Sequence, residues 1–436
     1  MTGRRRLFAA LGVALTAALA SASSSVHAAT PAAVEGVPRV DHVVTLVLEN
    51  ESFPATWGAN SAAKYLNGLI KQGAFVPNYF ATGHVSLDNY ITMTSGLSGA
   101  QIAATYTDCL GLNLYTCVQH VSAASAVSGS IADEMENAGV TWKQYSDGST
   151  APCVHADYSP TAQPDTYQGA GGTKGPGAGA DYADRHVPFL YYSNIIGNDQ
   201  RCASHLRPYS DLATDVAANK LPNYSFITPD TCNDGHDATC SSGRPGGLVA
   251  ADGFLVAQVP ALLSYLRSHN GVLFVVFDEG NAQDTAGCCN GGPAGQRGFG
   301  GQTGMLALGA PVLTTKTDSP YDHASLLRTT EDMLGITTHL NNAASAQPIT
   351  GIWGTPPQVD AESSGSASPG SQAGGGGGSS GGQPPAAAAA AVSLPNTSPT
   401  GMSLPATGLA LAVGALVVGF GSVHRRRTRR KPDTTH

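Results

Sequence analysis

His42-Val43-Val44-Thr45-Leu46-Val47-Leu48 leads directly into the polar pair Glu49-Asn50. An unbroken β-branched and aliphatic run of this kind is typical of a strand that is buried on both faces, as in a parallel sheet. A second such run, Val272 to Phe277, leads into Asp278-Glu279. Because the carboxyl ends of strands line the ligand crevice of an open α/β sheet, we expect these acids to converge on one place.

Similar short runs alternate with helical patterns from Pro38 to Thr355. This alternation predicts βα units around one sheet. We therefore expect residues 38–355 to form one large α/β domain, a three-layer sandwich with a mainly parallel central sheet. The further strand candidates are Ala74 to Ala81, Val140 to Tyr145 and Tyr224 to Thr228, and the helix candidates are Ala62 to Gln72, Ser86 to Thr94, Ser130 to Ala138, Phe254 to His269 and His323 to Leu334.

Residues 1–29 have the layout of a secretory signal peptide: Arg4-Arg5-Arg6, an apolar stretch from Leu7 to Ala20, and small residues up to Ala29. The alternative is a membrane anchor. The apolar stretch is shorter than the roughly 20 residues that span a bilayer, which favours secretion.

The C-terminal segment, residues 404–436, carries three features in order. Leu404-Pro405-Ala406-Thr407-Gly408 is followed by an uncharged run from Leu409 to Val423 and then by a tail rich in arginine. This order resembles the LPxTG sorting signal of Gram-positive surface proteins, in which a sortase joins the threonine to peptidoglycan. The resemblance implies a secreted protein that is covalently anchored to the cell wall. The alternative is a tail that stays in the membrane.

The segment between the domain and this signal, residues 356–403, contains Gly374 to Gly378 and Ala386 to Ala391. It has no apolar periodicity, so ordering it would bury nothing in return. We expect a flexible Gly/Ser/Pro/Ala stalk.

The charge balance excludes one class of partner. The chain has 23 Lys and Arg against 31 Asp and Glu; loss of both terminal signals would remove nine basic residues and one acidic residue, for a net charge of −16. Nucleic-acid binding relies on basic residues that displace counterions, so we expect no nucleic-acid partner.

All eight cysteines fall within residues 38–355. In an exported protein we expect disulfides, whose connectivity cannot be deduced from sequence. The adjacent Cys288 and Cys289 are expected to be too close to bond each other easily. The insert that carries them follows Asp278-Glu279 directly, and it either lines the substrate entrance or forms a pinned surface loop; we favour the loop.

Ser86 follows the second predicted strand and opens a predicted helix. The positive end of a helix favours an anion such as phosphate, which would suit a nucleophile at this position. From spacing alone, a simple helix N-cap is the more common role for such a serine.

The order of motifs resembles the bacterial phosphoesterase family, which contains secreted acid phosphatases and phospholipases C and is related to alkaline phosphatase. The match covers the whole domain. Two further segments resemble small secreted acid phosphatases that act on phosphatidylinositol 3-phosphate, namely Arg185-His186-Val187-Pro188-Phe189 and Gly351-Ile352-Trp353-Gly354. The motifs in chain order are His42 to Phe53, Gly83-His84-Val85-Ser86-Leu87-Asp88-Asn89-Tyr90, Pro229 with Asn233-Asp234-Gly235-His236-Asp237, Phe277-Asp278-Glu279-Gly280, and His323-Ala324-Ser325-Leu326-Leu327-Arg328-Thr329-Thr330-Glu331.

The resemblance implies an alkaline-phosphatase-like fold and a metal-dependent hydrolase. Ser86 would be both a metal ligand and the nucleophile of a phosphoserine mechanism, and Asn89 would neutralise phosphoryl charge. The oxygen-rich ligand set favours Mg²⁺, Ca²⁺ or Mn²⁺, with Zn²⁺ as an alternative. The remaining metal ligands would be Glu49, Asn50, Asp278 and Glu279, with Asp230 and Asp234 available for a second ion.

Leaving-group protonation requires an acid, and His84, His236 and His323 are the candidates. A structural role is the ordinary alternative for each of them. Arg328 is expected to pin its helix by a salt bridge rather than to touch phosphate. Asp88 replaces a proline that is usual in the family, and its carboxylate, two residues from Ser86, is expected to alter phosphate affinity.

The sequence favours a monomeric phosphomonoesterase that acts on a small phosphorylated substrate or a phosphoinositide headgroup. One alternative is a phospholipase C, which cleaves a diester; the chain lacks the extra β-rich module that is common in large enzymes of that kind. A second alternative is an inactive surface adhesin, against which the intact polar motifs argue.

Overall fold

The computed structural model describes residues 33–354, except 106, 123–128, 166, 168–174 and 290–298. The expected signal peptide (1–29), stalk (356–403) and sorting signal (404–436) lie outside the described residues.

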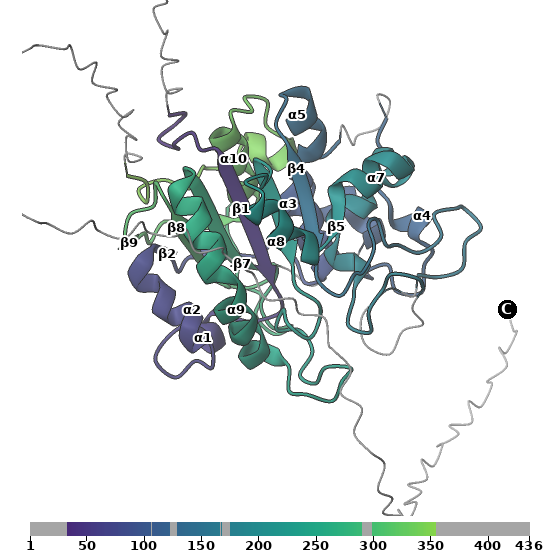
Figure 1. Ribbon diagram of the computed structural model, residues 1–436, viewed down its shortest axis with the longest axis horizontal. Coiled ribbons are helices and arrows are strands. Elements are labelled where there is room, and N and C mark those ends of the chain that lie inside the picture. The colour runs from purple at the N-terminus through teal and green to yellow at the C-terminus, as the bar shows by residue number, and fades with distance from the viewer. Residues whose placement is uncertain are drawn as a thin grey trace, which may run out of the picture. The chain divides into compact units, whose positions relative to one another are not determined.

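An eight-stranded sheet forms the centre of the domain, in the order β5-β4-β6-β1-β7-β8-β2-β9 (Figure 1). Most neighbours are parallel, and β8 runs antiparallel to both β7 and β2. A separate parallel pair joins β3 (Tyr79–Phe80) to β10 (Tyr321–Asp322). The strands of the large sheet are β1 (His42–Leu48), β2 (Ala74–Val76), β4 (Trp142–Ser146), β5 (Leu206–Pro208), β6 (Tyr224–Thr228), β7 (Gly271–Phe277), β8 (Met305–Gly309) and β9 (Thr315–Lys316).

Alternating residues of the central strands enter two separate apolar cores, one on each face of the sheet. In β1, Val43 and Val47 face one core, whereas Val44, Leu46 and Leu48 face the other. This alternation follows from the two-residue repeat of a strand. The first core is covered by α3 (Ser86–Ser95), α5 (Ile131–Asn137), α6 (Ser193–Ile196) and α10 (His323–Leu334), and the second by α2 (Lys64–Leu69), α8 (Ser210–Ala217) and α9 (Gly247–Ser268).

The shorter helical elements complete the chain. They are α1 (Phe53–Thr56), η1 (Ile70–Gln72), η2 (Gly99–Thr105), α4 (Leu114–Cys117), η3 (Asp184–His186), η4 (Pro188–Tyr191), α7 (Asp199–His205) and η5 (Asn341–Ala344).

The predicted three-layer α/β architecture with a mainly parallel sheet is confirmed. The expected strand Ala74 to Ala81 is instead two strands, β2 and β3, which belong to different sheets and are separated by Pro77-Asn78. Pro77 lacks the backbone N–H that would continue a ladder. Helix α9 begins at Gly247, ahead of the expected start at Phe254, because glycines near its beginning weaken the helical pattern in the sequence.

Among the described residues, α9 is the one helix long and apolar enough to cross a membrane. More than half of its most apolar window is buried inside the domain. Its Asp252 accepts hydrogen bonds from the backbone N–H groups of Tyr65 and Leu66, each at 2.9 Å. These contacts are those of a core helix.

All eight cysteines form disulfides, namely Cys109–Cys117, Cys153–Cys202, Cys232–Cys240 and Cys288–Cys289. The expectation that Cys288 and Cys289 would not bond each other was wrong. Cys289 has a φ of 70°, and this left-handed backbone departs from the extended geometry that would turn adjacent side chains apart.

Candidate active site

Three neighbouring strands, β6, β1 and β7, deliver acids to one edge of the sheet. Glu49 follows β1, Asp278 follows β7, and the segment that contains Asp234 follows β6. The backbone N–H of Glu49 donates to the carbonyl of Asp234 at 2.9 Å, and that of Asp278 donates to the carbonyl of Leu48 at 2.9 Å. The adjacency of parallel strands therefore brings together residues that are far apart in the chain.

Ser86 is the first residue of α3, and its hydroxyl donates to Oε2 of Glu49 at 2.9 Å. The N-cap position belongs to Val85, and Ser86 makes no capping bond to the helix. The N-cap alternative for Ser86 is therefore wrong. Tyr90 lies one turn further along α3, on the same side as Ser86, and its hydroxyl donates to Oε1 of Glu49.

The amide of Asn89 holds the loop that precedes Ser86. Its Oδ1 accepts from the N–H groups of Thr82 and Gly83, each at 3.0 Å, and its Nδ2 donates to the Gly83 carbonyl at 2.7 Å. These contacts use both ends of the amide to shape the loop. In this structure Asn89 therefore positions the loop, and its expected role in neutralising phosphoryl charge stays a prediction.

Glu49, His186 and Asp234 form a buried group whose ligand atoms all lie within 4.8 Å of one another. The imidazole of His186 lies between the two acids, with Nε2 3.5 Å from Glu49 Oε1 and Nδ1 3.3 Å from Asp234 Oδ2. Neither ring nitrogen makes a hydrogen bond in the described structure. Burial, with Arg185 and His236 nearby, holds the pKa of His186 well below its usual range, which leaves the neutral form that binds metals.

Asp278 and Asn50 extend this group. The backbone N–H of Asn50, which has a φ of 54°, donates to Oδ1 of Asp278 at 3.1 Å. Oδ2 of Asp278, Oδ1 of Asn50 and Oδ2 of Asp234 are buried without hydrogen-bond partners in the described structure.

Burial raises the pKa of Glu49 well above its usual value, and the nearby charges of Asp278 and Asp234 add to that rise. Burial also raises the pKa of Asp278 to about 6. Buried acids and polar atoms that lack partners are costly unless a cation satisfies them. The residues present therefore fit a divalent ion, and the imidazole of His186 makes the donor set suitable for Zn²⁺ or Mn²⁺ as well as for harder ions.

Two expected ligands, Asp230 and Glu279, are not members of the Glu49–His186–Asp234 group. Burial raises the pKa of Asp230 to about 8, and the neighbouring Asp147 and Asp181 raise it further; its Oδ1 accepts from the N–H of Asn233 at 2.9 Å. Glu279 is turned toward the Ser86 loop, where its Oε2 lies 3.4 Å from Asn89 Nδ2 and 3.5 Å from His84 Nδ1.

The three histidine candidates for the general acid differ in environment. His323 is fully buried, with Nε2 bonded to the Asp278 carbonyl at 2.6 Å and Nδ1 bonded to the Tyr79 hydroxyl at 2.8 Å. Burial lowers its pKa to about 4, so His323 stays neutral. Its hydrogen bond to the carbonyl of Asp278 holds the backbone of that residue in place. His84 is also buried, between Glu279 and the carbonyl of Asp284.

His236 keeps the most accessible imidazole of the three, with 31% of its side chain exposed. Its Nδ1 pairs with Asp237 Oδ1 at 2.8 Å, and its Nε2 accepts from Arg185 Nη2 at 3.3 Å. Burial acts to lower the pKa of the Arg185 guanidinium, but the neighbouring charges of Asp108, Glu49 and Asp234 outweigh it and raise that pKa above its usual value. A buried cation therefore lies among the site acids, where an anionic substrate group would meet it.

Arg185, His186 and Tyr90 were given no role at the sequence level, although all three stand in the quoted motifs. Tyr90 could have been found from its position four residues after Ser86, which places both on one helix face. Arg185 and His186 lie in the short helical turn η3. Only the folded chain places that turn over Glu49.

Asp88 does not face the Ser86 hydroxyl. Its Oδ1 accepts from the Thr105 hydroxyl, which links α3 to η2. Burial raises its pKa to about 8. Arg328 pairs with Glu35 at 3.0 Å and with Asp332 at 3.1 Å, so it pins α10 as expected.

Residues 280–289, the described first part of the cysteine-rich insert, are mostly exposed but contact the site loop. The Asp284 carbonyl bonds Nε2 of His84, and Asn281 N–H donates to the Ser52 hydroxyl at 2.8 Å. The described part of the insert therefore lies at the surface and also supports His84.

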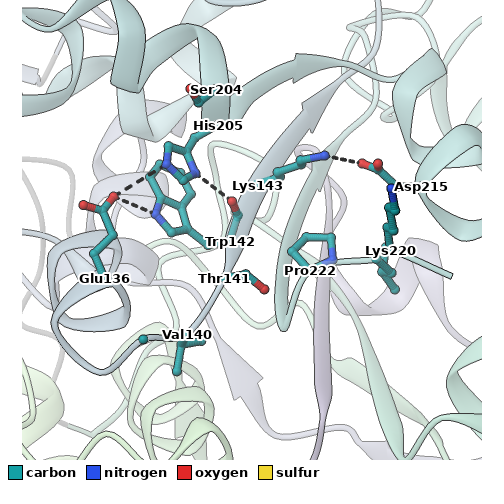
Figure 2. Close-up of a pocket in the computed structure, with 12 residues that line it drawn as sticks. Glu136, Val140, Thr141, Trp142, Lys143, Ser204, His205, Asp215, Lys220 and Pro222 are labelled. Carbon is teal, nitrogen blue, oxygen red and sulfur yellow. Dashed lines mark hydrogen bonds and ion pairs between the residues drawn. The ribbon is translucent and has the colours of Figure 1, made fainter. Parts of the chain in front are cut away.

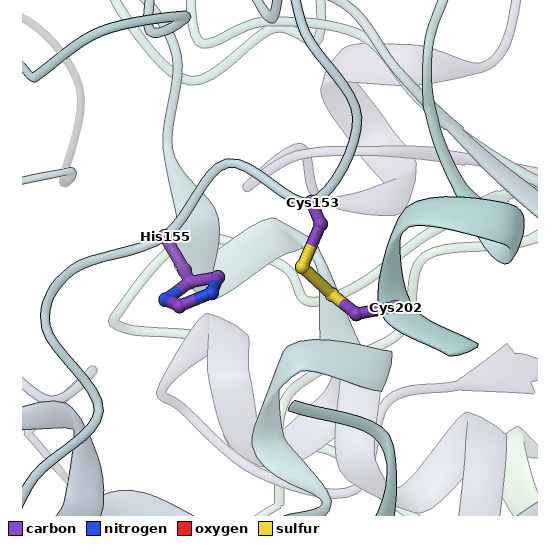
Figure 3. A group of neighbouring side chains, drawn as sticks. All are labelled: Cys153, His155 and Cys202. Atoms are coloured by element: carbon purple, nitrogen blue, oxygen red, sulfur yellow. A yellow bond between two sulfur atoms is a disulfide. The ribbon is translucent and has the colours of Figure 1, made fainter. Parts of the chain in front are cut away.

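Two other features lie outside this site. Cys153, His155 and Cys202 cluster at metal-ligand spacing, but the two cysteines form a disulfide and offer no thiolate (Figure 3). A cavity of about 720 Å³ lies at the opposite edge of the sheet, by the starts of β4 and β6. Its charged groups are largely paired, with Lys143 2.5 Å from Asp215 and Glu136 3.0 Å from Trp142 Nε1 (Figure 2).

The comparison with known families agrees with this geometry. Residues 59–337 match the Phosphoesterase family, and the chain belongs to that family. Its class is accordingly that of the phosphoric ester hydrolases.

Two relatives are similar in sequence to most of this chain. A phosphatidylinositol-3-phosphatase of Mycobacterium tuberculosis is 26% identical, over 80% of this chain and 94% of that protein. A probable acid phosphatase of Kluyveromyces lactis is 27% identical, over 76% of this chain and 66% of that protein. The chain spans about half the length of an acid phosphatase from Penicillium chrysogenum.

Among solved structures, a protein in the alkaline phosphatase superfamily from Vibrio parahaemolyticus has a similar fold. The TM-score is 0.44, with 12% identity, over 73% of this chain and 72% of that chain.

Proposed function

We propose that the protein is a metal-dependent phosphomonoesterase that works through a phosphoserine intermediate on Ser86. The observation that carries this proposal is the 2.9 Å hydrogen bond from the Ser86 hydroxyl to Glu49, inside a buried group of acids with a histidine. A serine hydroxyl needs such a neighbour to become a nucleophile.

Glu49, His186 and Asp234 would hold the ion, with Asn50 and Asp278 beside them. When bound, a divalent cation would activate the serine hydroxyl and neutralise phosphoryl charge.

The protein's own residues account for the proton transfers. The proton of Ser86 passes along its existing hydrogen bond to Oε2 of Glu49 as Oγ forms a bond to phosphorus. The bond from phosphorus to the leaving oxygen breaks. His236 acts in its doubly protonated form: Nδ1–H stays on Asp237, and Nε2–H turns from Arg185 to the leaving oxygen and gives it a proton. Water then attacks phosphorus and gives a proton to His236, and the bond from phosphorus to Ser86 Oγ breaks as Glu49 returns its proton to Oγ. Arg185 binds the non-bridging oxygens throughout, because it is the buried cation beside these groups.

The substrate class is a phosphomonoester, and a phosphoinositide headgroup is the preferred candidate. The relative from Mycobacterium tuberculosis named for that activity is matched over nearly its whole length, which favours this substrate over the diester of a phospholipase C. Hydrolysis of a monoester and a diester, side by side and with and without a chelator, separates the two.

The Ser86→Ala variant tests the mechanism. We expect its turnover to fall by several orders of magnitude, because phosphomonoester hydrolysis is extremely slow without catalysis. Its melting temperature and its binding of inorganic phosphate should largely survive. Mass spectrometry of acid-quenched wild-type protein should find a phosphate on Ser86. Near-normal turnover of the variant would remove the covalent mechanism, and an inactive wild-type protein would support the adhesin alternative.

We also propose that the enzyme is exported and attached to the cell wall, on the basis of Leu404-Pro405-Ala406-Thr407-Gly408 and the segments that follow it. Changing Thr407 to Ala should move the enzyme into the medium or the membrane without changing its specific activity. Wild-type protein found wholly in the medium with its terminal arginines intact would contradict the attachment.

A further inference from the structure

We propose that Asp108 is a positioning residue that joins the start of the Ser86 helix to Arg185. This inference rests on the proposed function, because it concerns how the phosphate-binding arginine is held relative to the nucleophile. Asp108 lies in the loop between η2 and α4, and it belongs to none of the motifs that identify the family.

The first contact of Asp108 is with α3. Helix α3 begins after Val85, whose side chain cannot accept a hydrogen bond from the first turn. Oδ1 of Asp108 accepts from the N–H of Leu87 at 2.9 Å and so supplies the missing cap from a distant part of the chain. A carboxylate at this end of a helix is also favoured by the helix dipole.

The second contact is with Arg185. Oδ2 of Asp108 lies 4.0 Å from Nε of Arg185, and both side chains are largely buried. The other end of the guanidinium donates to His236. Arg185 is therefore held between Asp108 and the proposed general acid.

The backbone fixes Asp108 in place. Its N–H donates to the Thr105 carbonyl at 2.9 Å, and the next residue forms the Cys109–Cys117 disulfide. Asp108 and Cys109 both have positive φ, 53° and 62°, which makes a tight turn. One carboxylate on a disulfide-bonded turn thus touches both the nucleophile helix and the cation that would bind phosphate.

Asp108→Asn separates these two tasks. The amide oxygen of asparagine can still accept from Leu87, whereas the charge that holds Arg185 is lost. We expect a melting temperature close to that of the wild type, a raised KM for a phosphomonoester, and a loss of kcat/KM of about ten- to hundredfold, because misplaced binding groups cost that much. Phosphate affinity, measured by calorimetry on the full chain with its disulfides intact, should fall in parallel.

A double-mutant cycle gives the decisive readout. In an Arg185→Gln background, Asp108→Asn should add little further loss, because the group that it positions is already gone. The inference would be overturned if Asp108→Asn lowered kcat/KM by the same factor in the wild-type and the Arg185→Gln backgrounds. It would also be overturned if Asp108→Asn lowered only the melting temperature.

Asp133 provides a matched control. It caps α5 by accepting from the N–H of Ser130 and pairs with Arg201 at 2.8 Å, but it lies outside the site. Asp133→Asn should leave KM and phosphate affinity unchanged, and an equal effect from this variant would also contradict the role of Asp108. Wild-type protein without phosphomonoesterase activity would refute the proposed function alone. The role of Asp108 would still be tested by the same double-mutant cycle, with phosphate affinity measured by calorimetry in place of turnover.

Discussion

Glu49 shows how much one buried residue can organise. Its carboxylate accepts hydrogen bonds from the hydroxyls of Ser86 and Tyr90 and lies beside the imidazole of His186. Its backbone N–H donates to the carbonyl of Asp234, in the segment that follows β6. Its raised pKa means that the charged form is unfavourable unless a cation is bound. The residue is therefore costly to bury in its charged form, a pattern that is common at functional sites.

Replacing Glu49 with Gln should remove the bound ion and lower turnover by at least about a hundredfold, as expected when a group that accepts a proton is lost. The melting temperature of the metal-free protein should stay the same or rise, because the variant no longer buries a carboxylate. Elemental analysis, turnover and calorimetry on one preparation measure all three. Glu51→Gln, two residues away, is the control. Unchanged metal content in Glu49→Gln would show that the ion site lies elsewhere.

Replacing His236 with Gln should affect substrates unequally. An aryl phosphate with a good leaving group needs little protonation, whereas an alkyl phosphate depends on the acid. We expect the loss in kcat to be much larger for the alkyl ester. A comparison of the two esters across pH checks this, and equal losses would assign His236 to binding rather than to proton transfer.

At the scale of elements, the site depends on close packing of two loops. Gly300 lies where the insert returns to the Ser86 loop, and its N–H donates to the Ala81 carbonyl at 3.2 Å. A Cβ on Gly300 would lie 2.2 Å from the Gly83 carbonyl oxygen. The backbone of Gly83 cannot move aside easily, so the close contact between the two loops requires a glycine at position 300.

Gly300→Ala should therefore displace the loop before Ser86 and lower both kcat and the melting temperature. Gly253 in α9 is the matched control, because it is exposed and a Cβ there meets nothing within 4 Å. Gly253→Ala should stabilise the helix by roughly 0.5 to 1 kcal/mol without changing turnover. Normal kinetics in Gly300→Ala would mean that the two loops move independently.

At the scale of the whole molecule, several buried acids favour the protonated form. Glu134 of α5 and Glu331 of α10 influence each other electrostatically, and burial, together with the charge of Glu134, raises the pKa of Glu331 to about 9. Both residues stand on helices that pack against the same core, on one face of the sheet.

Because the folded pKa of Glu331 is above its usual value, its stabilising contribution is complete below about pH 4.5 and is lost as pH rises toward about 9. We expect the melting temperature to fall as pH rises through this window. Glu331→Gln should flatten the dependence, since glutamine can still accept the Leu340 N–H and carries no charge. Asp318→Asn, at an exposed position, should not. An unchanged slope in Glu331→Gln would mean that other acids dominate.

The order of short apolar runs and the acids that follow them were enough to predict the layers of the fold and to place Glu49 and Asp278 near each other, whereas Ser86 was assigned to the site by the family resemblance. These features are local, because the two-residue repeat of a strand and the start of a helix are properties of a few adjacent residues. The break between β2 and β3 and the antiparallel β8 depend on pairing between distant segments, which periodicity does not encode.

The tertiary structure alone decided which other residues join the site. His186, Arg185 and Asp108 reach it from short turns and loops, whose paths over the sheet are determined by packing and by disulfides. The tertiary structure also separated residues of one chemical type. His323 and His236 are both histidines in family motifs. His323 is buried and hydrogen-bonded to the Asp278 carbonyl, whereas His236 is partly exposed to solvent and pairs with Asp237. Burial and partners set the protonation of a side chain, and both arise only when the chain is folded.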